Sequence, residues 1–233
     1  MSQKILAIIP ARGGSKGIIK KNLAIAYGKP LIQWTIEAAL KSPSISKIIV
    51  SSDDPATLNF SQNFNINTTV RPDNLALDSS SSESVIAHCL SELDTAGEHY
   101  DFIILLQPTS PARNHHHIEQ AIATLVNSNA TSLISCFLPE HSPYKSFTLN
   151  NTGFLTGIIN NALPFMPRQK LPVTYYPNGA IYIIQTDQFR TNQLLFTKKC
   201  IPFQMNQQES IDIDTQDSID KFNDFMGIKN DTY

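Results

Sequence analysis

The residues best suited to chemistry lie in a glycine-rich segment early in the sequence. Three glycines, Gly13, Gly14 and Gly17, are interspersed with four cations, Arg12, Lys16, Lys20 and Lys21. Glycines let backbone N–H groups approach an anion closely, and neighbouring cations favour a phosphate. The segment directly follows an apolar run at residues 5–9, which predicts a strand buried on both faces. Because open α/β sheets bind ligands where their strands end, we interpret the segment as a phosphate-binding loop rather than a solvated surface loop.

Two common phosphate-binding motifs do not occur in this segment. A P-loop needs a glycine, four residues and then Gly-Lys-Ser or Gly-Lys-Thr, and the sequence contains no such string. The dinucleotide fingerprint Gly-x-Gly-x-x-Gly is also missing, since the glycines fall at positions 13, 14 and 17. The pattern therefore disfavours an ATPase and a dehydrogenase.

A second group of candidate residues is Asp212-Ile213-Asp214, within a stretch at residues 210–214 that is predicted as a strand. Residues two apart on a strand project from the same face, so both carboxylates would converge. Such a pair, together with phosphate oxygens, suits Mg²⁺. The alternative is that Asp214 or Thr215 caps the following helix and Asp212 is a surface residue. A phosphate loop and a Mg²⁺ site are both needed for nucleotidyl transfer, so their combination favours the metal site.

Alternating strands and helices must position these groups. Apolar runs predict strands at residues 5–9, 47–50, 68–70, 102–106, 133–136, 179–184 and 210–214. Amphipathic spacing predicts helices at residues 31–40, 83–93, 114–126 and 216–226, and Asp54 is expected to cap a further helix. This alternation predicts a three-layer α/β/α fold with a mostly parallel sheet, in a single domain over residues 1–233. Residues 138–174 break the pattern and are expected to leave the sheet, with a hairpin near residues 150–153, as an arm for dimerisation.

The composition excludes several classes of protein. A net charge of −2 gives no reason to expect binding to nucleic acid or to an anionic membrane, and no apolar run approaches membrane-spanning length. The three cysteines are widely spaced and form no Cys-x-x-Cys pair, which argues against a zinc site and a disulfide framework. We therefore expect a cytoplasmic protein. The tract His115-His116-His117 is expected to be a solvated helical turn, because successive residues on a helix point in different directions.

Several strings in the sequence resemble the motifs of one enzyme family. They are Ile9-Pro10-Ala11-Arg12-Gly13-Gly14-Ser15-Lys16-Gly17 with Lys21-Asn22, Arg71-Pro72, Leu106-Gln107-Pro108-Thr109-Ser110-Pro111, Pro167-Arg168-Gln169, Pro177-Asn178-Gly179-Ala180-Ile181-Tyr182 and Ser210-Ile211-Asp212-Ile213-Asp214-Thr215. In this order the strings are similar to the signature of the acylneuraminate cytidylyltransferases, the CMP–sialic acid synthetases and their legionaminic and pseudaminic acid relatives. The motifs span nearly the whole chain, so their combination is far more specific than any one of them.

The resemblance implies a role for each matching residue. CTP would be held by Ala11, Arg12, Gly13, Ser15, Lys16, Lys21, Asn22, Arg71 and Ser82, with Asn22 and Arg71 recognising the cytidine. The acidic sugar would be bound by Gln107, Asn178 and Tyr182, and by Lys145 and Arg168 from the arm of the partner in a homodimer. Mg²⁺ would be held by Asp212 and Asp214. The residues implied in catalysis are Lys21, Arg12 and Asp214.

The implied reaction is attack by the anomeric hydroxyl of a nine-carbon α-keto sugar acid on the α-phosphate of CTP, with release of pyrophosphate. Bidentate pairing suits an arginine to the sugar carboxylate, and lysines suit phosphates as point charges. A carboxylate or a hydroxide held by the metal would deprotonate the sugar hydroxyl, and Asp214 is the candidate carboxylate.

The sequence departs from the family pattern at two places. Ile18-Ile19 stands where many members have a proline after the first isoleucine, and Tyr176 stands where an arginine commonly precedes Pro-Asn-Gly. The second change leaves the sugar open among N-acetylneuraminic, legionaminic and pseudaminic acids, and Leu195 with Phe196 could line a pocket for an N-acyl group. The alternatives are a cytidylyltransferase for an octulosonate-type sugar and a non-catalytic nucleotide-sugar-binding module.

Overall fold

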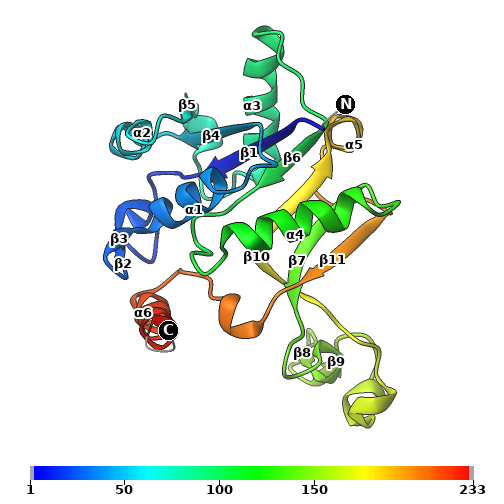
Figure 1. The fold of residues 1–233 in the computed structure, drawn as a ribbon. Coiled ribbons are helices and arrows are strands. Elements are labelled where there is room, and N and C mark those ends of the chain that lie inside the picture. Colours follow the sequence, from blue (N-terminus) through cyan, green and yellow to red (C-terminus); the bar gives the residue numbers. More distant parts are fainter. Residues whose placement is uncertain (1–2, 231–233) are drawn as a thin grey trace.

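The computed structural model describes residues 3–230, with side chains described to residue 228. Within that range a seven-stranded sheet forms the centre, in the order β11-β7-β10-β6-β1-β4-β5 (Figure 1). Its strands are β1 (Ile5–Pro10), β4 (Lys47–Ser52), β5 (Asn67–Val70), β6 (Phe102–Leu105), β7 (Ser132–Phe137), β10 (Tyr176–Gln185) and β11 (Cys200–Gln204). Neighbouring strands are parallel, except that β10 runs antiparallel to both β6 and β7. The predicted mostly parallel sheet is therefore confirmed.

Strand β1 lies near the middle of the sheet because both of its faces are apolar. Ile5, Ala7 and Ile9 join one hydrophobic cluster, while Leu6 and Ile8 join a second on the opposite face. The alternation follows from the two-residue period of a strand. It accounts for a continuous apolar run in which all five side chains are buried.

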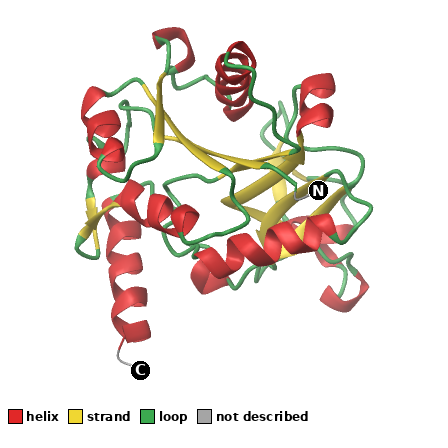
Figure 2. Ribbon diagram, turned by 45° about the horizontal axis from the view of Figure 1, so that its top comes forward, coloured by secondary structure: helices red, strands yellow, loops and turns green. Residues whose placement is uncertain are grey.

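Helices cover both faces of the sheet, which confirms the three-layer architecture (Figure 2). Helices α1 (Leu31–Leu40) and α4 (His115–Val126) pack on the first cluster, with residues of α2 (Pro55–Gln62) at its margin. Helices α3 (Ser82–Thr95) and α5 (Thr186–Asn192) pack on the second. Helix α6 (Gln216–Asn230) packs with the start of α1 and the short hairpin of β2 (Ile25–Ala26) and β3 (Lys29–Pro30).

Side-chain caps begin the helices where the sequence predicts them. Asp54 accepts hydrogen bonds from the backbone N–H groups of Ala56 and Thr57 at the start of α2. Asn114 and His117 form a reciprocal capping box on α4, and Ser81 caps α3. Each cap satisfies N–H groups that the helix itself leaves unpaired.

The structure differs from the predicted elements in the last third of the chain. Residues 210–214 form no strand, so the predicted same-face geometry of a strand does not apply to the two aspartates. Instead the segment attaches to the loop after β6, since the Ile213 N–H donates to the Thr109 carbonyl at 2.8 Å. The last strand is β11, which the sequence reading missed; its Pro202 is tolerated because β11 lies at the edge of the sheet.

Residues 138–174, hereafter the arm, leave the sheet after β7 and return to it at β10, as predicted. The arm contains a hairpin of β8 (Phe147–Leu149) and β9 (Leu155–Gly157) and extends from the sheet at the lower right of Figure 1. Its use in dimerisation stays a prediction. Among the described residues, no helix is both long and apolar enough to cross a bilayer.

Candidate active site

A cleft of about 320 Å³ opens at the carboxyl ends of the central strands. It is lined by Pro10, Arg12, Gly14, Ser15, Lys21, Asn22, Arg71, Leu77, Asp78, Ser80, Ser81, Ser82, Val85, Gln107, Pro108, Thr109, Asp212 and Asp214. These residues come from four stretches of the chain, three of which follow the ends of β1, β5 and β6 and the last of which precedes α6. Because β10 runs in the opposite direction, its first residues also reach this edge of the sheet.

The loop after β1 is fixed to the end of β4. The Gly13 N–H donates to Asp53 Oδ1 at 2.9 Å, and the Ala11 N–H donates to the Ser51 carbonyl at 2.9 Å. A Cβ at Gly13 would lie 2.8 Å from Asp54 Cβ, closer than two carbons can approach, so this position requires glycine. The buried Asn22 amide closes the loop by donating to the Arg12 carbonyl at 2.8 Å.

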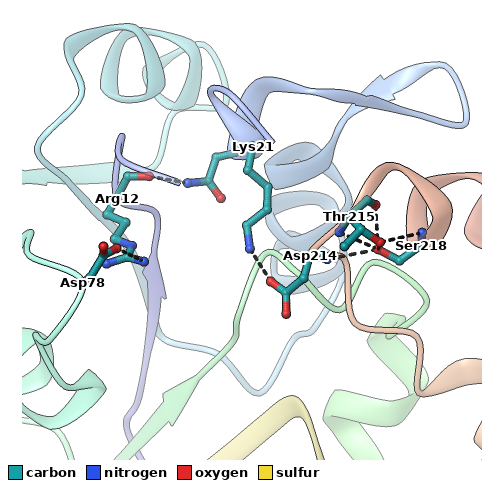
Figure 3. A network of polar contacts seen from close by, with 7 residues as sticks. Arg12, Lys21, Asp78, Asp214, Thr215 and Ser218 are labelled. Atoms are coloured by element: carbon teal, nitrogen blue, oxygen red, sulfur yellow. Dashed lines mark hydrogen bonds and ion pairs between the residues drawn. The ribbon is translucent and has the colours of Figure 1, made fainter. Parts of the chain in front are cut away.

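Arg12 and Lys16 share one carboxylate (Figure 3 shows the Arg12 pair). Asp78 lies 2.8 Å from Arg12 Nη2 and 2.9 Å from Lys16 Nζ, and Arg12 Nη1 also donates to the Leu77 carbonyl. The hydrogen bond from Lys16 and the nearby Arg12 charge hold the pKa of Asp78 below its ordinary value. Arg12 lines the cleft, whereas the Lys16 side chain is 84% exposed at its margin.

Lys21 brings together the loop after β1, hereafter the first loop, and residues 210–214, hereafter the aspartate segment. Its Nζ donates to Asp214 Oδ1 at 2.7 Å across 193 residues of sequence (Figure 3). Gly17 lies directly against the Asp214 carbonyl, where any Cβ would collide with that oxygen. The loop after β1 therefore meets the segment that carries Asp212 and Asp214, although that segment is no strand.

Asp212 and Asp214 both line the cleft, on either side of the fully buried Ile213. Surrounding protein raises the pKa of Asp212 by desolvation, and the Asp214 charge raises it further, while a hydrogen bond with Thr109 opposes the shift. Within the described residues no group of three histidine, cysteine or acidic side chains gathers to hold a metal. Two carboxylates that repel each other at an open cleft nevertheless fit Mg²⁺, because it completes its shell with water and phosphate oxygens.

The floor of the cleft contains Arg71, which is 4% exposed. Its Nη2 donates to the Ser51 carbonyl at 2.8 Å and its Nε to the Ser51 hydroxyl at 3.3 Å. Burial lowers the pKa of Arg71, while Asp53 acts in the opposite direction. Beneath it, burial raises the pKa of Cys89 to about 12, so this thiol is no nucleophile at neutral pH. Ser82 lies nearby, at the N-terminal end of α3.

On the opposite side of the cleft, Gln107 lies against the first residues of β10. Gly179 has φ +75°, and a Cβ there would lie 2.7 Å from Gln107 Oε1. Glycine therefore serves both the backbone conformation and the close approach of the Gln107 side chain.

Asn178 and Tyr182 do not line the described cleft, in contrast to their predicted place. The Asn178 amide is buried and occupied: it donates to Ser210 Oγ at 2.9 Å and accepts from Ser135 Oγ at 2.6 Å. It thus connects β7, β10 and the aspartate segment. Tyr182 packs beside the second hydrophobic cluster, where burial raises its pKa.

Lys145 and Arg168 are predicted to serve the cleft of a partner chain, and that prediction is not tested by this chain's own cleft. Lys145 and Arg168 belong to short 3₁₀ helices of the arm and are not among the described residues that line the cleft. Leu195 is buried in the second cluster and Phe196 is 64% exposed, and neither lines this cleft, so the N-acyl pocket at these two residues stays a prediction. His117 caps α4 rather than forming part of a metal tract.

The arrangement matches a known family over almost the whole chain. The family model described as Cytidylyltransferase matches residues 6–231. The chain belongs to this family. Among curated relatives, the chain is 33% identical to the N-acylneuraminate cytidylyltransferase of Escherichia coli, over 92% of the chain and 50% of the relative. It is 31% identical to the CMP-N,N'-diacetyllegionaminic acid synthase of Legionella pneumophila, over 91% of each protein. It is 29% identical to the pseudaminic acid cytidylyltransferase of Campylobacter jejuni, again over 91% of each.

The lengths of these relatives differ. The chain spans about half the length of the E. coli protein and of the matching Streptococcus agalactiae proteins. A solved structure of CMP:2-keto-3-deoxy-manno-octonic acid synthetase complexed with CTP has a TM-score of 0.70 at 18% identity, covering 97% of this chain and 99% of that one. This likeness shows the fold.

Sequence reasoning missed three residues that line the cleft or hold its loops. Asp78 pairs with both loop cations, Asp53 anchors Gly13, and Thr109 holds the aspartate segment through its carbonyl. Asp53 stands three residues after the predicted strand at residues 47–50, which is a usable signal. Asp78 and Thr109 lie in loops whose course is set by tertiary packing, and only Thr109 falls within a quoted motif.

Proposed function

We propose that this chain transfers the cytidylyl group of CTP to a nonulosonic acid, giving the CMP-sugar and pyrophosphate. The observation that carries the proposal is the meeting of Arg12, Lys21, Asp212 and Asp214 at one cleft, with Gln107 on its other side. Cations for a triphosphate and oxygen ligands for a hard metal occur together there. A non-catalytic binding module would have no use for the second set.

The nucleotide is assigned to the side of the cleft formed by the first loop. Arg71 and Asn22 lie at its floor with buried polar groups, which suits recognition of the cytidine. Ala11, Gly13, Ser15 and Ser82 offer backbone or hydroxyl groups around the phosphates. Arg12 and Lys16 supply the charge, with the Arg12 fork suited to two phosphate oxygens and the lysine to one.

Asp212 and Asp214 would hold Mg²⁺, which supplies positive charge against the negative charge of the phosphates. The raised pKa of Asp212 supports this role, because a cation would relieve the desolvation and repulsion that raise it. Lys21 lies beside the same carboxylates and is our candidate for the group that faces the reacting phosphorus. Its ion pair with Asp214 holds the ammonium at the cleft.

The acceptor is assigned to the Gln107 side of the cleft. The anomeric hydroxyl of the sugar acid would attack the α-phosphorus of CTP, the bond to the leaving pyrophosphate would break, and Asp214 would accept the hydroxyl proton. The curated relatives are named for N-acylneuraminic, diacetyllegionaminic and pseudaminic acids, so the acceptor belongs to this class. Tyr182 and Asn178 would support the acceptor side from behind Gln107.

We assign Lys145 and Arg168 to the cleft of a partner chain in a homodimer. The arm supports this because many of its apolar side chains are exposed: Phe147, Leu149, Phe154, Leu155, Ile158, Ile159, Phe165 and Val173. Apolar surface of this extent on one projecting segment is typical of a protein interface. We also place the enzyme in the cytoplasm, where CTP is at hand and its free cysteines would stay reduced.

Pyrophosphate release tests the reaction directly. The chain is incubated with CTP, Mg²⁺ and, separately, N-acetylneuraminic, N,N'-diacetyllegionaminic, pseudaminic and 3-deoxy-manno-octulosonic acids. We expect release with a nine-carbon acid and loss of release in Asp212→Asn. Release only with the octulosonate would replace the acceptor class, and no release with any acid would refute the synthetase.

Mixing two inactive variants tests the arm. If Arg168 serves the partner's cleft, equal amounts of Arg168→Ala and Asp212→Asn chains should regain about a quarter of wild-type turnover after exchange. Half of the dimers would then be mixed, each with one complete site. No recovery, or sedimentation of the wild type as a monomer, would remove Arg168 and Lys145 from the site.

A further inference from the structure

Arg113 is a buried cation with no buried anion beside it. The residue is 1% exposed, and among the described residues no carboxylate lies within ion-pair distance. Its hydrogen bonds go to neutral acceptors: Nη1 donates to the Gln107 and Ala180 carbonyls at 3.2 and 3.1 Å, and Nη2 donates to Thr35 Oγ1 at 2.6 Å. Its Nε has no partner in the described part of the chain.

Such an arrangement is costly, because a guanidinium loses its hydration on burial and no opposite charge replaces it. Burial lowers the pKa of Arg113 to about 9, so the group still carries its charge at pH 7. The three acceptors that Arg113 binds, two carbonyls and a hydroxyl, could equally accept hydrogen bonds from water or from a neutral side chain. The charge itself therefore calls for an explanation.

The position of Arg113 gives that explanation. Both carbonyls that it binds belong to the acceptor side of the cleft: Gln107 lines the cleft, and Ala180 follows Gly179, which lies against the Gln107 side chain. The guanidinium thus lies one layer of backbone beneath the place assigned to the sugar acid. In a medium of low polarity, an unpaired charge acts over such a separation with little screening.

We propose that Arg113 gives the cleft its preference for an acidic acceptor, by placing an uncancelled positive charge beneath the Gln107 side of the site. This proposal rests on the proposed function. Arg113 touches no substrate and is a positioning residue, which acts through its field and through the backbone of Gln107. The competing view is a structural clamp that joins the loop after β6 to β10 and does not depend on charge.

Charge-retaining and charge-removing substitutions separate the two views. Lysine keeps the charge and cannot reproduce the guanidinium fork, whereas glutamine keeps a donor and loses the charge. For a field effect, Arg113→Gln should raise the KM for the acid that the wild type uses by about tenfold, with the KM for CTP unchanged. Arg113→Lys should stay within about threefold of the wild type. Thr35→Val removes one buried hydrogen bond and no charge, and should leave both KM values unchanged.

The proposal would be overturned if loss of the charge proved no more damaging than loss of the guanidinium fork. If lysine and glutamine were equally damaging, or if kcat and both KM values changed together, Arg113 would be a clamp. Melting curves establish that each variant is folded, and Arg113→Met replaces Arg113→Gln should the latter not fold. If Arg113→Gln kept the kcat and both KM values of the wild type, this inference would be refuted and the proposed function would stand. No wild-type turnover with any acid would refute the proposed function, and this inference with it.

Discussion

Replacing Gly17 with alanine tests how the first loop and the aspartate segment are held together. The new Cβ would lie far inside van der Waals contact with the Asp214 carbonyl oxygen, which is backbone and cannot swing away. Restoring an ordinary separation requires the two segments to move apart by roughly 1 Å. Because Lys21 and Asp214 meet across the same junction, the movement would displace the proposed catalytic groups relative to one another.

A misplacement of about 1 Å costs about 10²-fold in rate, or about 2.7 kcal/mol of transition-state stabilisation. We therefore expect Gly17→Ala to lower kcat for pyrophosphate release by about 10²-fold at saturating CTP and acid. Gly227→Ala is the matched control, since its Cβ meets nothing within 4 Å and it lies in α6. The control should keep wild-type turnover. A Gly17→Ala enzyme within about threefold of the wild type would refute the claim that this contact sets the geometry.

Three further predictions follow from the charges of the site and of the helix caps. Asp78→Asn removes the carboxylate that pairs with Arg12 and Lys16. It should therefore tighten the binding of inorganic triphosphate measured by calorimetry, and the gain in affinity should disappear at high salt. Weaker binding would show that Asp78 helps to hold the ligand. The pKa of Asp212 is raised in the folded chain, so at pH values above the ordinary pKa of an aspartate its ionisation opposes folding. Asp212→Asn should therefore melt at a higher temperature than the metal-free wild type. Mg²⁺ should raise the melting temperature of the wild type only, and an equal rise in both would contradict the metal assignment. The pKa of Asp54 is lowered, first by the hydrogen bond from Thr57, so its ionised form stabilises the fold above pH about 4 and this stability is lost as acid protonates it. Asp54→Asn should accordingly lose less stability than the wild type in urea titrations between pH about 6 and about 3, and parallel losses would refute the linkage.

Local rules in the sequence predicted much of the fold. The apolar run of β1 and the caps Asp54 and Asn114 depend on neighbours within a few residues, so they can be predicted without a partner elsewhere in the chain. Strand β11 could not be predicted in this way. Its five residues contain a proline and are only partly covered, and they form a strand because β7 offers a free edge.

The candidate site was predicted in its parts and not in its assembly. The first loop, Gln107 and the two aspartates were assigned from motif and residue type, and all line one cleft. The means of convergence was predicted wrongly, because residues 210–214 are held by Thr109 and Gly17 instead of by strand pairing. Asn178 was assigned to the acceptor pocket, but its side-chain amide forms hydrogen bonds with Ser135 and Ser210 in the interior.

The sequence alone determined that a phosphate-binding loop follows a buried strand, since glycines, cations and apolar runs express their preferences over a few residues. It also determined the family, through motifs spread over nearly the whole chain. Tertiary structure decided which charges meet: Asp78 with Arg12, Lys21 with Asp214, and no carboxylate with Arg113 among the described residues. Such pairs depend on the through-space distance between groups that lie up to 193 residues apart, and only the folded chain sets that distance.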